Sequence, residues 1–126
     1  MKKITFFIAC LSLVTFMACN KSNAKRIVGT WKATKVMEGA KDVTTDWTKN
    51  SYTETYASGD GYSYTGQPDG KSGSGKYAWD NETVLKRSGV SGQSSVTCTI
   101  TTLDKSNLSF SCVDNGTTWQ FSFQKQ

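Results

Sequence analysis

The chain has 126 residues, with 15 lysines and arginines against 10 acidic residues and no histidine, which gives a formal net charge of +5. This charge is spread along the chain rather than gathered on one face or helix, so we expect no nucleic-acid partner. The lack of histidine excludes Ser-His triads and most zinc sites, and the acidic residues do not have the spacing of a calcium loop. We therefore expect a protein that is not an enzyme and that uses neither a metal nor a cofactor.

The first 18 residues have the pattern of a lipoprotein signal peptide. Lys2 and Lys3 precede an apolar run, Ile4 to Ala18, which is shorter than the about 20 residues of a membrane-spanning helix. The run passes into the letters FMAC, which end at Cys19 and resemble a bacterial lipobox. In a lipobox the cysteine carries diacylglycerol and becomes the mature N-terminus. Ordinary cleavage that leaves a free cysteine is the alternative.

By this resemblance Cys19 is the site of lipid attachment and residues 19–26 are a polar, structureless tether to a domain at residues 27–126. The next residue is Asn20 rather than aspartate, and the sorting pattern of Gram-negative lipoproteins then implies the outer membrane. The resemblance thus implies a protein of the bacterial cell envelope that meets the membrane through its N-terminal lipid.

Beyond the tether, polar and apolar residues alternate in short runs separated by turn residues, which is typical of antiparallel β-strands. The sequence predicts eight strands, at residues 29–37, 50–57, 61–65, 75–80, 82–88, 94–102, 107–113 and 117–124. Asp60-Gly61 and Asn115-Gly116 predict two-residue type I′ turns, because these residues tolerate the positive φ that such turns require.

The two cysteines of the domain, Cys98 and Cys112, lie on neighbouring predicted strands. The register predicted for this hairpin pairs Thr102 with Leu108, Ile100 with Phe110, and Cys98 with Cys112. Directly opposed residues have Cβ atoms about 4.5–5.5 Å apart, close to the separation that a disulfide needs. We therefore predict a structural disulfide, which contributes roughly 3 kcal/mol when it closes a loop of about 15 residues. A redox-active pair is disfavoured because the CxxC spacing is missing.

Each predicted strand has one apolar and one polar face, and no helix is available to cover the apolar side. The sheet must therefore close on itself or stack in two layers. Eight strands joined in sequence by short turns favour an all-β, eight-stranded antiparallel up-and-down barrel, because closure removes the exposed edges. The side chains expected to point inward are Trp31, Tyr62, Tyr64, Tyr77, Trp79, Phe110, Trp119, Phe121 and Phe123.

The letters GTW at the start of the first strand resemble the G-x-W motif of lipocalins, and small bacterial lipocalin-like lipoproteins share the wider layout. The matching segments are YTETYASGDGYSY at 52–64 and WQFSFQK at 119–125. The resemblance implies that Gly29 and Trp31 form the plug of the barrel base and that Lys125 covers the indole. The chain is shorter than an animal lipocalin, and the residues after the last predicted strand do not suggest the flanking helix that is usual in lipocalins.

An up-and-down barrel places its odd-numbered connections together at the open end, opposite the tether. These are residues 38–49, 66–75 and 89–93 and the turn at 115–116. Long loops on a rigid scaffold commonly carry binding, so we expect the site at this mouth, with Trp47 as a lid or anchor. A tryptophan folded onto the rim for stability is the alternative. The candidate residues for a ligand are Trp47, Tyr52, Tyr56, Tyr62, Tyr64, Tyr77, Trp79 and Trp119.

The leading hypothesis is a lipid-anchored, lipocalin-like binding module that takes up a small hydrophobic ligand or holds a protein partner at its mouth. An eight-stranded lumen is wide enough for one small ligand, but it can also be filled by its own side chains. A surface lipoprotein without a ligand is therefore one alternative.

The other alternative is a protein inhibitor, because SGSGKY at 72–77 resembles the serine-glycine loop of membrane-bound C-type lysozyme inhibitors. The resemblance implies that Ser72 or Ser74, together with Lys86, would enter the lysozyme cleft. The cysteines depart from that family, because both lie in one hairpin.

Overall fold

The computed structural model of the protein describes residues 23–89 and 95–126. The signal peptide predicted at 1–18 and the lipid attachment at Cys19 lie outside the described residues. The elements are β1 (Gly29–Glu38), β2 (Lys41–Asp42), α2 (Thr44–Thr48), β3 (Thr53–Tyr56), β4 (Gly61–Thr65), β5 (Gly73–Trp79), β6 (Val84–Ser88), β7 (Val96–Leu103), β8 (Asn107–Asp114) and β9 (Thr117–Lys125). In this part of the chain no helix has the length and apolar character needed to cross a bilayer.

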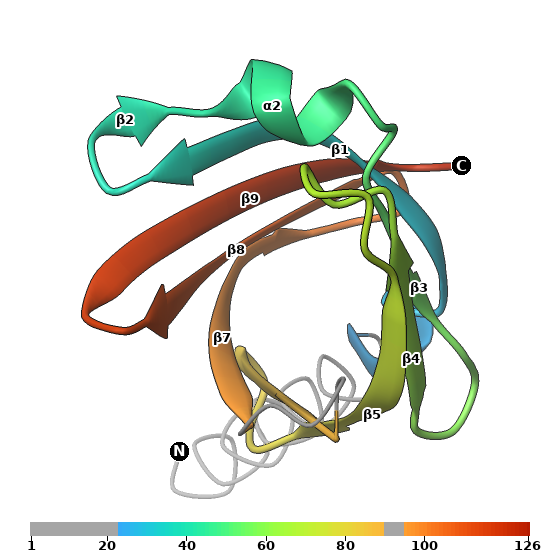
Figure 1. Cartoon of the computed structure of the whole chain (residues 1–126). Coiled ribbons are helices and arrows are strands. Elements are labelled where there is room, and N and C mark those ends of the chain that lie inside the picture. Colours follow the sequence, from blue (N-terminus) through green and yellow to red (C-terminus); the bar gives the residue numbers. More distant parts are fainter. Residues whose placement is uncertain (1–22, 90–94) are drawn as a thin grey trace, which may run out of the picture.

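The strands form a closed antiparallel barrel, as predicted. Strands β1 and β3 to β9 pair in sequence order, and β9 returns to pair with β1, so that the sheet closes on itself (Figure 1). The short strand β2 adds to β1 outside this ring. Closure leaves the eight barrel strands without a free edge. The prediction of an eight-stranded up-and-down barrel is therefore confirmed.

Two segments that we expected to be irregular contain regular structure. The connection at 38–49 turns back on β1 as β2 and then forms α2, which lies against β1 in Figure 1. The hydroxyl of Thr44 fixes this arrangement, since it accepts from the backbone N–H of Val36 at 3.1 Å. Residues 23–26, the described part of the predicted tether, form a helical turn, and Asn23 donates through its amide to the carbonyl of Glu82 at 3.0 Å.

Of the two predicted type I′ turns, the structure agrees with one and differs from the other. The turn at Asn115-Gly116 has φ angles of 49° and 77°, as the prediction requires. The prediction for Asp60-Gly61 was wrong, because the connection spans residues 57–60 and its positive φ, 103°, belongs to Gly59. The longer connection is closed by the N–H of Ala57, which donates to the carbonyl of Gly61 at 2.8 Å.

The β7–β8 hairpin has the predicted register at its disulfide end. Cys98 faces Cys112 with 4.5 Å between the Cα atoms, the two residues form a disulfide, and Ile100 faces Phe110. The predicted pairing of Thr102 with Leu108 was wrong, because an irregularity between Ile100 and Thr102 shifts the register. Beyond that point Leu103 faces Leu108. An inserted residue of this kind moves every later pair along the strand by one position.

The base of the barrel is sealed by the residues that precede and begin β1. Ile27 and Trp31 have no exposed surface, and the indole N–H of Trp31 donates to the carbonyl of Ile27 at 2.8 Å. The ammonium of Lys125 lies 5.3 Å from the centroid of the Trp31 ring. A Cβ built on Gly29 would lie 2.7 Å from Cε of Lys125, so glycine leaves the space that the lysine stem occupies.

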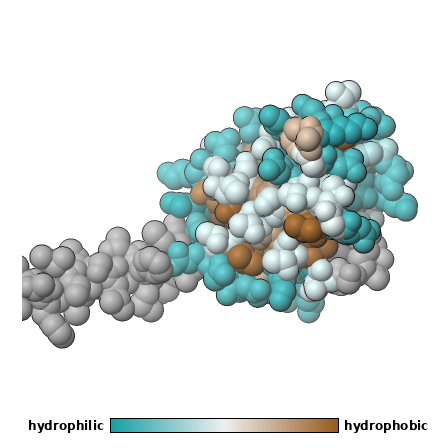
Figure 2. Space-filling view, turned by 90° about the vertical axis from the view of Figure 1, so that its left-hand side faces the viewer, coloured by the Kyte–Doolittle hydropathy of each residue, from teal (hydrophilic) through white to brown (hydrophobic). Residues whose placement is uncertain are grey.

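The outer wall is rich in hydroxyl groups. On β7 the exposed residues are threonines, at positions 97, 99, 101 and 102. Figure 2 shows a face on which residues of intermediate hydropathy, drawn pale, separate a few hydrophobic patches. Among the described residues, Val113 is the large hydrophobic side chain that is strongly exposed, at 65%. Most apolar side chains of the strands are thus directed into the barrel.

Candidate binding site at the mouth of the barrel

A cavity of about 180 Å³ lies at the end of the barrel opposite the sealed base. It is bounded by residues at the ends of several strands that point toward the mouth. Arg87 lies one residue before the end of β6, Val96 begins β7, and Asp114 ends β8. The complete lining is Trp47, Tyr52, Tyr62, Tyr64, Gln67, Arg87, Val96, Cys112, Asp114, Trp119 and Phe121. The barrel is therefore not completely filled by its own side chains.

Trp47 joins the helix α2 to the aromatic wall of this cavity. Its ring lies 4.8 Å from that of Tyr52, 5.2 Å from that of Phe121 and 5.7 Å from that of Trp119, measured between centroids. All three pairs are edge-to-face, the geometry that the ring quadrupoles favour. Trp47 thus packs on the rim and also lines the cavity, a position compatible with either role considered for it.

The two long connections meet at this end of the barrel, as predicted. Asn50, after α2, donates through its amide to the carbonyl of Gln67 at 3.0 Å. Gly66 lies so close to this segment that an added Cβ would collide with the carbonyl oxygen of Asn50. The loop residue Gln67 then lines the cavity itself. Part of the third connection, residues 90–94, lies outside the described residues.

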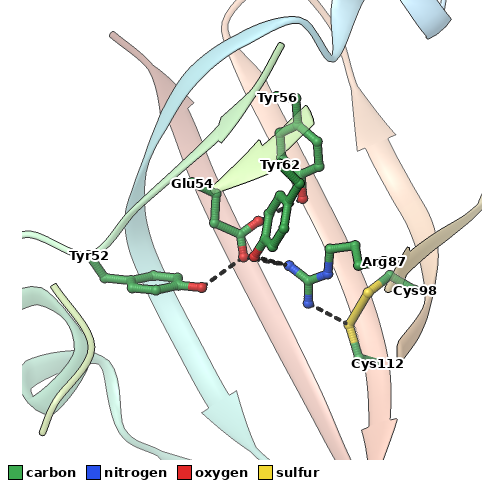
Figure 3. The surroundings of a disulfide bond; sticks show 7 residues. All are labelled: Tyr52, Glu54, Tyr56, Tyr62, Arg87, Cys98 and Cys112. Atoms are coloured by element: carbon green, nitrogen blue, oxygen red, sulfur yellow. Dashed lines mark hydrogen bonds and ion pairs between the residues drawn. A yellow bond between two sulfur atoms is a disulfide. The ribbon is translucent and has the colours of Figure 1, made fainter. Parts of the chain in front are cut away.

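Arg87, which lines the cavity, forms a buried ion pair with Glu54, and we call these two residues the floor of the cavity; Figure 3 shows the pair and its neighbours. Nη1 of Arg87 donates to Oε1 of Glu54 at 2.7 Å, and the side chains of Glu54 and Arg87 are 1% and 11% exposed. Tyr52 donates to Oε1 of Glu54 at 2.9 Å, and Tyr56 donates to Oε2 at 2.7 Å. Both carboxylate oxygens are therefore satisfied, as the burial of a charged group requires.

The guanidinium of Arg87 also contacts rings and sulfur. Its Nη1 donates to the hydroxyl of Tyr62 at 2.7 Å, and its Nη2 lies 3.9 Å from Sγ of Cys112. The Cζ atom is 4.9 Å from the ring centroid of Tyr62 and 5.3 Å from that of Phe110. Arg87 thus reaches the disulfide on one side and the acidic residue on the other, as Figure 3 shows.

The electrostatics of this cluster keep its tyrosines neutral and its arginine charged. Burial raises the pKa of Tyr52, Tyr56 and Tyr62, and the negative charge of Glu54 raises each of them further. For Arg87, burial alone lowers the pKa, but the charge of Glu54 and the surrounding phenol oxygens outweigh it and hold the pKa well above its ordinary value.

Five of the eight residues proposed for a ligand line the cavity: Trp47, Tyr52, Tyr62, Tyr64 and Trp119. The other three do not. Tyr56 binds Glu54 deeper in the barrel, and the hydroxyl of Tyr77 donates to the carbonyl of Ala57 at 2.7 Å. Trp79 is the last residue of β5, at the base end of the barrel, and is half-buried. Its buried indole N–H has no acceptor among the described residues. All three pack in the core of the barrel, but none of them lines the cavity.

The charged pair itself was missed in the sequence. Its signal is the alternation of side chains along each strand. Glu54 lies midway between the inward Tyr52 and Tyr56, and Arg87 follows the inward Leu85 by two residues. Both therefore occupy positions whose side chains point into the barrel, although charged residues are rarely buried without a partner. The parity was sufficient to predict that the two residues point inward, but not that they meet.

The residues considered for a lysozyme inhibitor do not form a loop. Ser74 lies in β5, where it faces Ser63 of β4. Ser72 immediately precedes that strand, and Lys86, on β6, forms an exposed ion pair with Asp80 at 3.4 Å. The serine-glycine segment is thus mostly strand rather than a projecting loop.

The described residues form no group of three or more histidine, cysteine, aspartate or glutamate side chains that could hold a metal ion. No protein-family model matches the chain, and a search of curated proteins found none similar to it. The fold and the cavity are therefore the basis on which a function can be argued.

Proposed function

We propose that the protein is a lipid-anchored, lipocalin-like binding module of the bacterial cell envelope that holds a small hydrophobic molecule at the barrel mouth. The observation that carries this proposal is the cavity of about 180 Å³ bounded by Trp47, Tyr52, Tyr64, Trp119 and Phe121. Aromatic and apolar walls with a few convergent polar groups are typical of small-molecule sites.

The size of the cavity limits what it can enclose. An engineered apolar cavity of about 150 Å³ binds benzene. A volume of about 180 Å³ therefore suits one ring with a small substituent, and a larger ligand would extend out of the mouth. The chain enters the barrel at the sealed base, where β1 begins, so a lipid carried by Cys19 would hold the barrel by that end and the mouth would face away from the membrane.

The test is a titration of the full chain in lipid nanodiscs with benzene or toluene. Binding is measured from the change in tryptophan fluorescence and in melting temperature. We expect saturable changes, because Trp47 and Trp119 line the cavity. Val96→Phe, which adds volume inside the cavity, should abolish them. Val113→Phe is the matched control, because Val113 is 65% exposed outside the cavity.

If neither compound gives a saturable change, or if both variants respond like the parent protein, the proposal is wrong. Because the two variants share the same membrane, partitioning of the compounds into lipid affects both equally.

A further inference from the structure

The polar floor of the cavity defines the chemistry that a ligand must present. A guanidinium carries five N–H donors. Within the described residues, Arg87 donates to Glu54 and Tyr62 from Nη1 and to the sulfur of Cys112 from Nη2. These three contacts leave two of the five donors without an acceptor in this part of the chain, and Arg87 lines the cavity.

The other oxygen-bearing residues of the lining, Tyr52, Tyr64, Gln67 and Asp114, accept no hydrogen bond from Arg87 within the described residues, and the apolar lining has no acceptor to offer. Trp47, Trp119 and Phe121 present ring surfaces, and the sulfur of Cys112 is a weak acceptor that lies 3.9 Å from Nη2. A ligand oxygen that reaches the floor would therefore receive a charge-assisted hydrogen bond in an environment with little water. A pure hydrocarbon would cover the guanidinium without offering it an acceptor.

The charge of the ligand is restricted by Glu54. Its carboxylate already balances Arg87 at 2.7 Å, so the buried pair is neutral as a unit. A second carboxylate beside Arg87 would place two negative charges against one positive charge in a site of low dielectric constant, which is unfavourable. Asp114, the other charged residue of the lining, adds negative charge at the mouth. A neutral ligand oxygen is repelled neither by Glu54 at the floor nor by Asp114 at the mouth.

We infer that the site selects a small uncharged molecule with a ring-sized apolar body and one oxygen acceptor, such as an amide or ketone, and that Arg87 binds this oxygen. In this assignment Glu54 acts as a positioning residue that excludes anions. This inference rests on the proposed function and names the ligand class of the same site.

The experiment compares three probes of nearly equal shape, namely benzamide, benzoate and toluene, in titrations of the full chain in nanodiscs. A hydrogen bond to a charged donor corresponds to about tenfold to a hundredfold in affinity. We expect benzamide to bind at least about tenfold more tightly than benzoate. Benzoate binding more tightly than benzamide would overturn the inference.

Two variants test whether the difference in affinity between benzamide and benzoate depends on the ion pair of Glu54 and Arg87. Glu54→Gln removes the negative charge but keeps an oxygen for the tyrosine hydroxyls, so the preference should shift toward benzoate by about tenfold or more. Glu54→Gln combined with Arg87→Met should lose the benzamide affinity and keep toluene binding. Equal benzamide affinity in the parent and in this double variant would also overturn the inference.

The result distinguishes this inference from the proposed function. If toluene binds but benzamide gains nothing from Arg87, the binding module stands and the ligand class is wrong. If none of the three probes binds, the proposed function fails as well. The comparison of probes on the parent protein needs no variant, so it gives an answer even if a substitution prevents folding.

Discussion

Nη1 of Arg87 on β6 lies 2.7 Å from Oε1 of Glu54 on β3, and the contact joins two strands that have β4 and β5 between them in the sheet. Removing one partner of a buried pair leaves an uncompensated charge, which costs about 3–5 kcal/mol. Arg87→Met should therefore lower the free energy of unfolding by about this amount in urea denaturation.

Adding Glu54→Gln to Arg87→Met should restore a large part of that loss, because the remaining buried charge disappears. Lys86→Met is the matched control, since Lys86 pairs with Asp80 at the surface, where the two side chains are 49% and 46% exposed. It should cost less than about 1 kcal/mol. Equal stability of the single and double variants would contradict a coupled pair.

Alkaline pH should destabilise the barrel through its buried tyrosines. Tyr52, Tyr56 and Tyr62 have pKa values raised above 10.0 in the folded protein, so their contribution to stability is complete below pH 10. Above that pH the unfolded chain loses protons that the folded chain keeps, and stability falls. The slope is about 1.4 kcal/mol per pH unit for each tyrosine, or about 4 kcal/mol per pH unit for all three.

The measurement is the free energy of unfolding in urea at a series of pH values on both sides of 10, together with tyrosinate absorbance. Tyr56→Phe should reduce the slope by the share of one tyrosine, about 1.4 kcal/mol per pH unit. A slope that does not change in this variant would show that Tyr56 is not among the groups that cause the fall.

The disulfide should stabilise the barrel by about 3 kcal/mol, because Cys98 and Cys112 are 14 positions apart in the sequence and close a loop of about 15 residues. Reduction should therefore lower the urea midpoint. A variant in which both cysteines are replaced by alanine is the control, and reductant should leave its midpoint unchanged. An unchanged midpoint after complete reduction of the parent protein, verified by a thiol assay, would contradict the prediction.

Gly29→Ala should loosen the base of the barrel. Gly29 has a φ of 139°, and the new Cβ would lie 2.7 Å from Cε of Lys125. We expect a loss of about 1–3 kcal/mol from backbone strain, together with displacement of Lys125 from Trp31. Gly59→Ala is the control for the backbone effect alone, because Gly59 also has a large positive φ, 103°, but nothing lies within 4 Å of its added Cβ.

A Lys125→Ala background separates the two causes at Gly29. If the steric contact matters, Gly29→Ala should cost less in this background than in the parent protein, as measured by thermal and urea unfolding. Lys125→Ala alone should cost about 0.5–1 kcal/mol, the value of an exposed cation–π contact. The same cost of Gly29→Ala in both backgrounds would assign the whole effect to the backbone.

The amino-acid sequence by itself determined the eight strands of the barrel, the faces they present and the pairing of Cys98 with Cys112. These features depend on the two-residue period of a strand, which is local and can be counted. The alternation around Cys98 and Cys112 was enough to place them opposite each other. The predicted register of the β7–β8 hairpin is wrong only beyond the irregularity near Thr102, which shifts the remaining pairs.

Only the tertiary structure decided how deep each inward side chain lies and which side chains meet. Parity gave Tyr64 and Tyr77 the same inward direction, yet only Tyr64 lines the mouth cavity. Glu54 and Arg87 are 33 positions apart, and their contact depends on the stagger of β3 to β6 and on closure of the ring by β1 and β9. Depth and closure are properties of the assembled barrel, because they follow from the relative positions of all its strands rather than from any one segment.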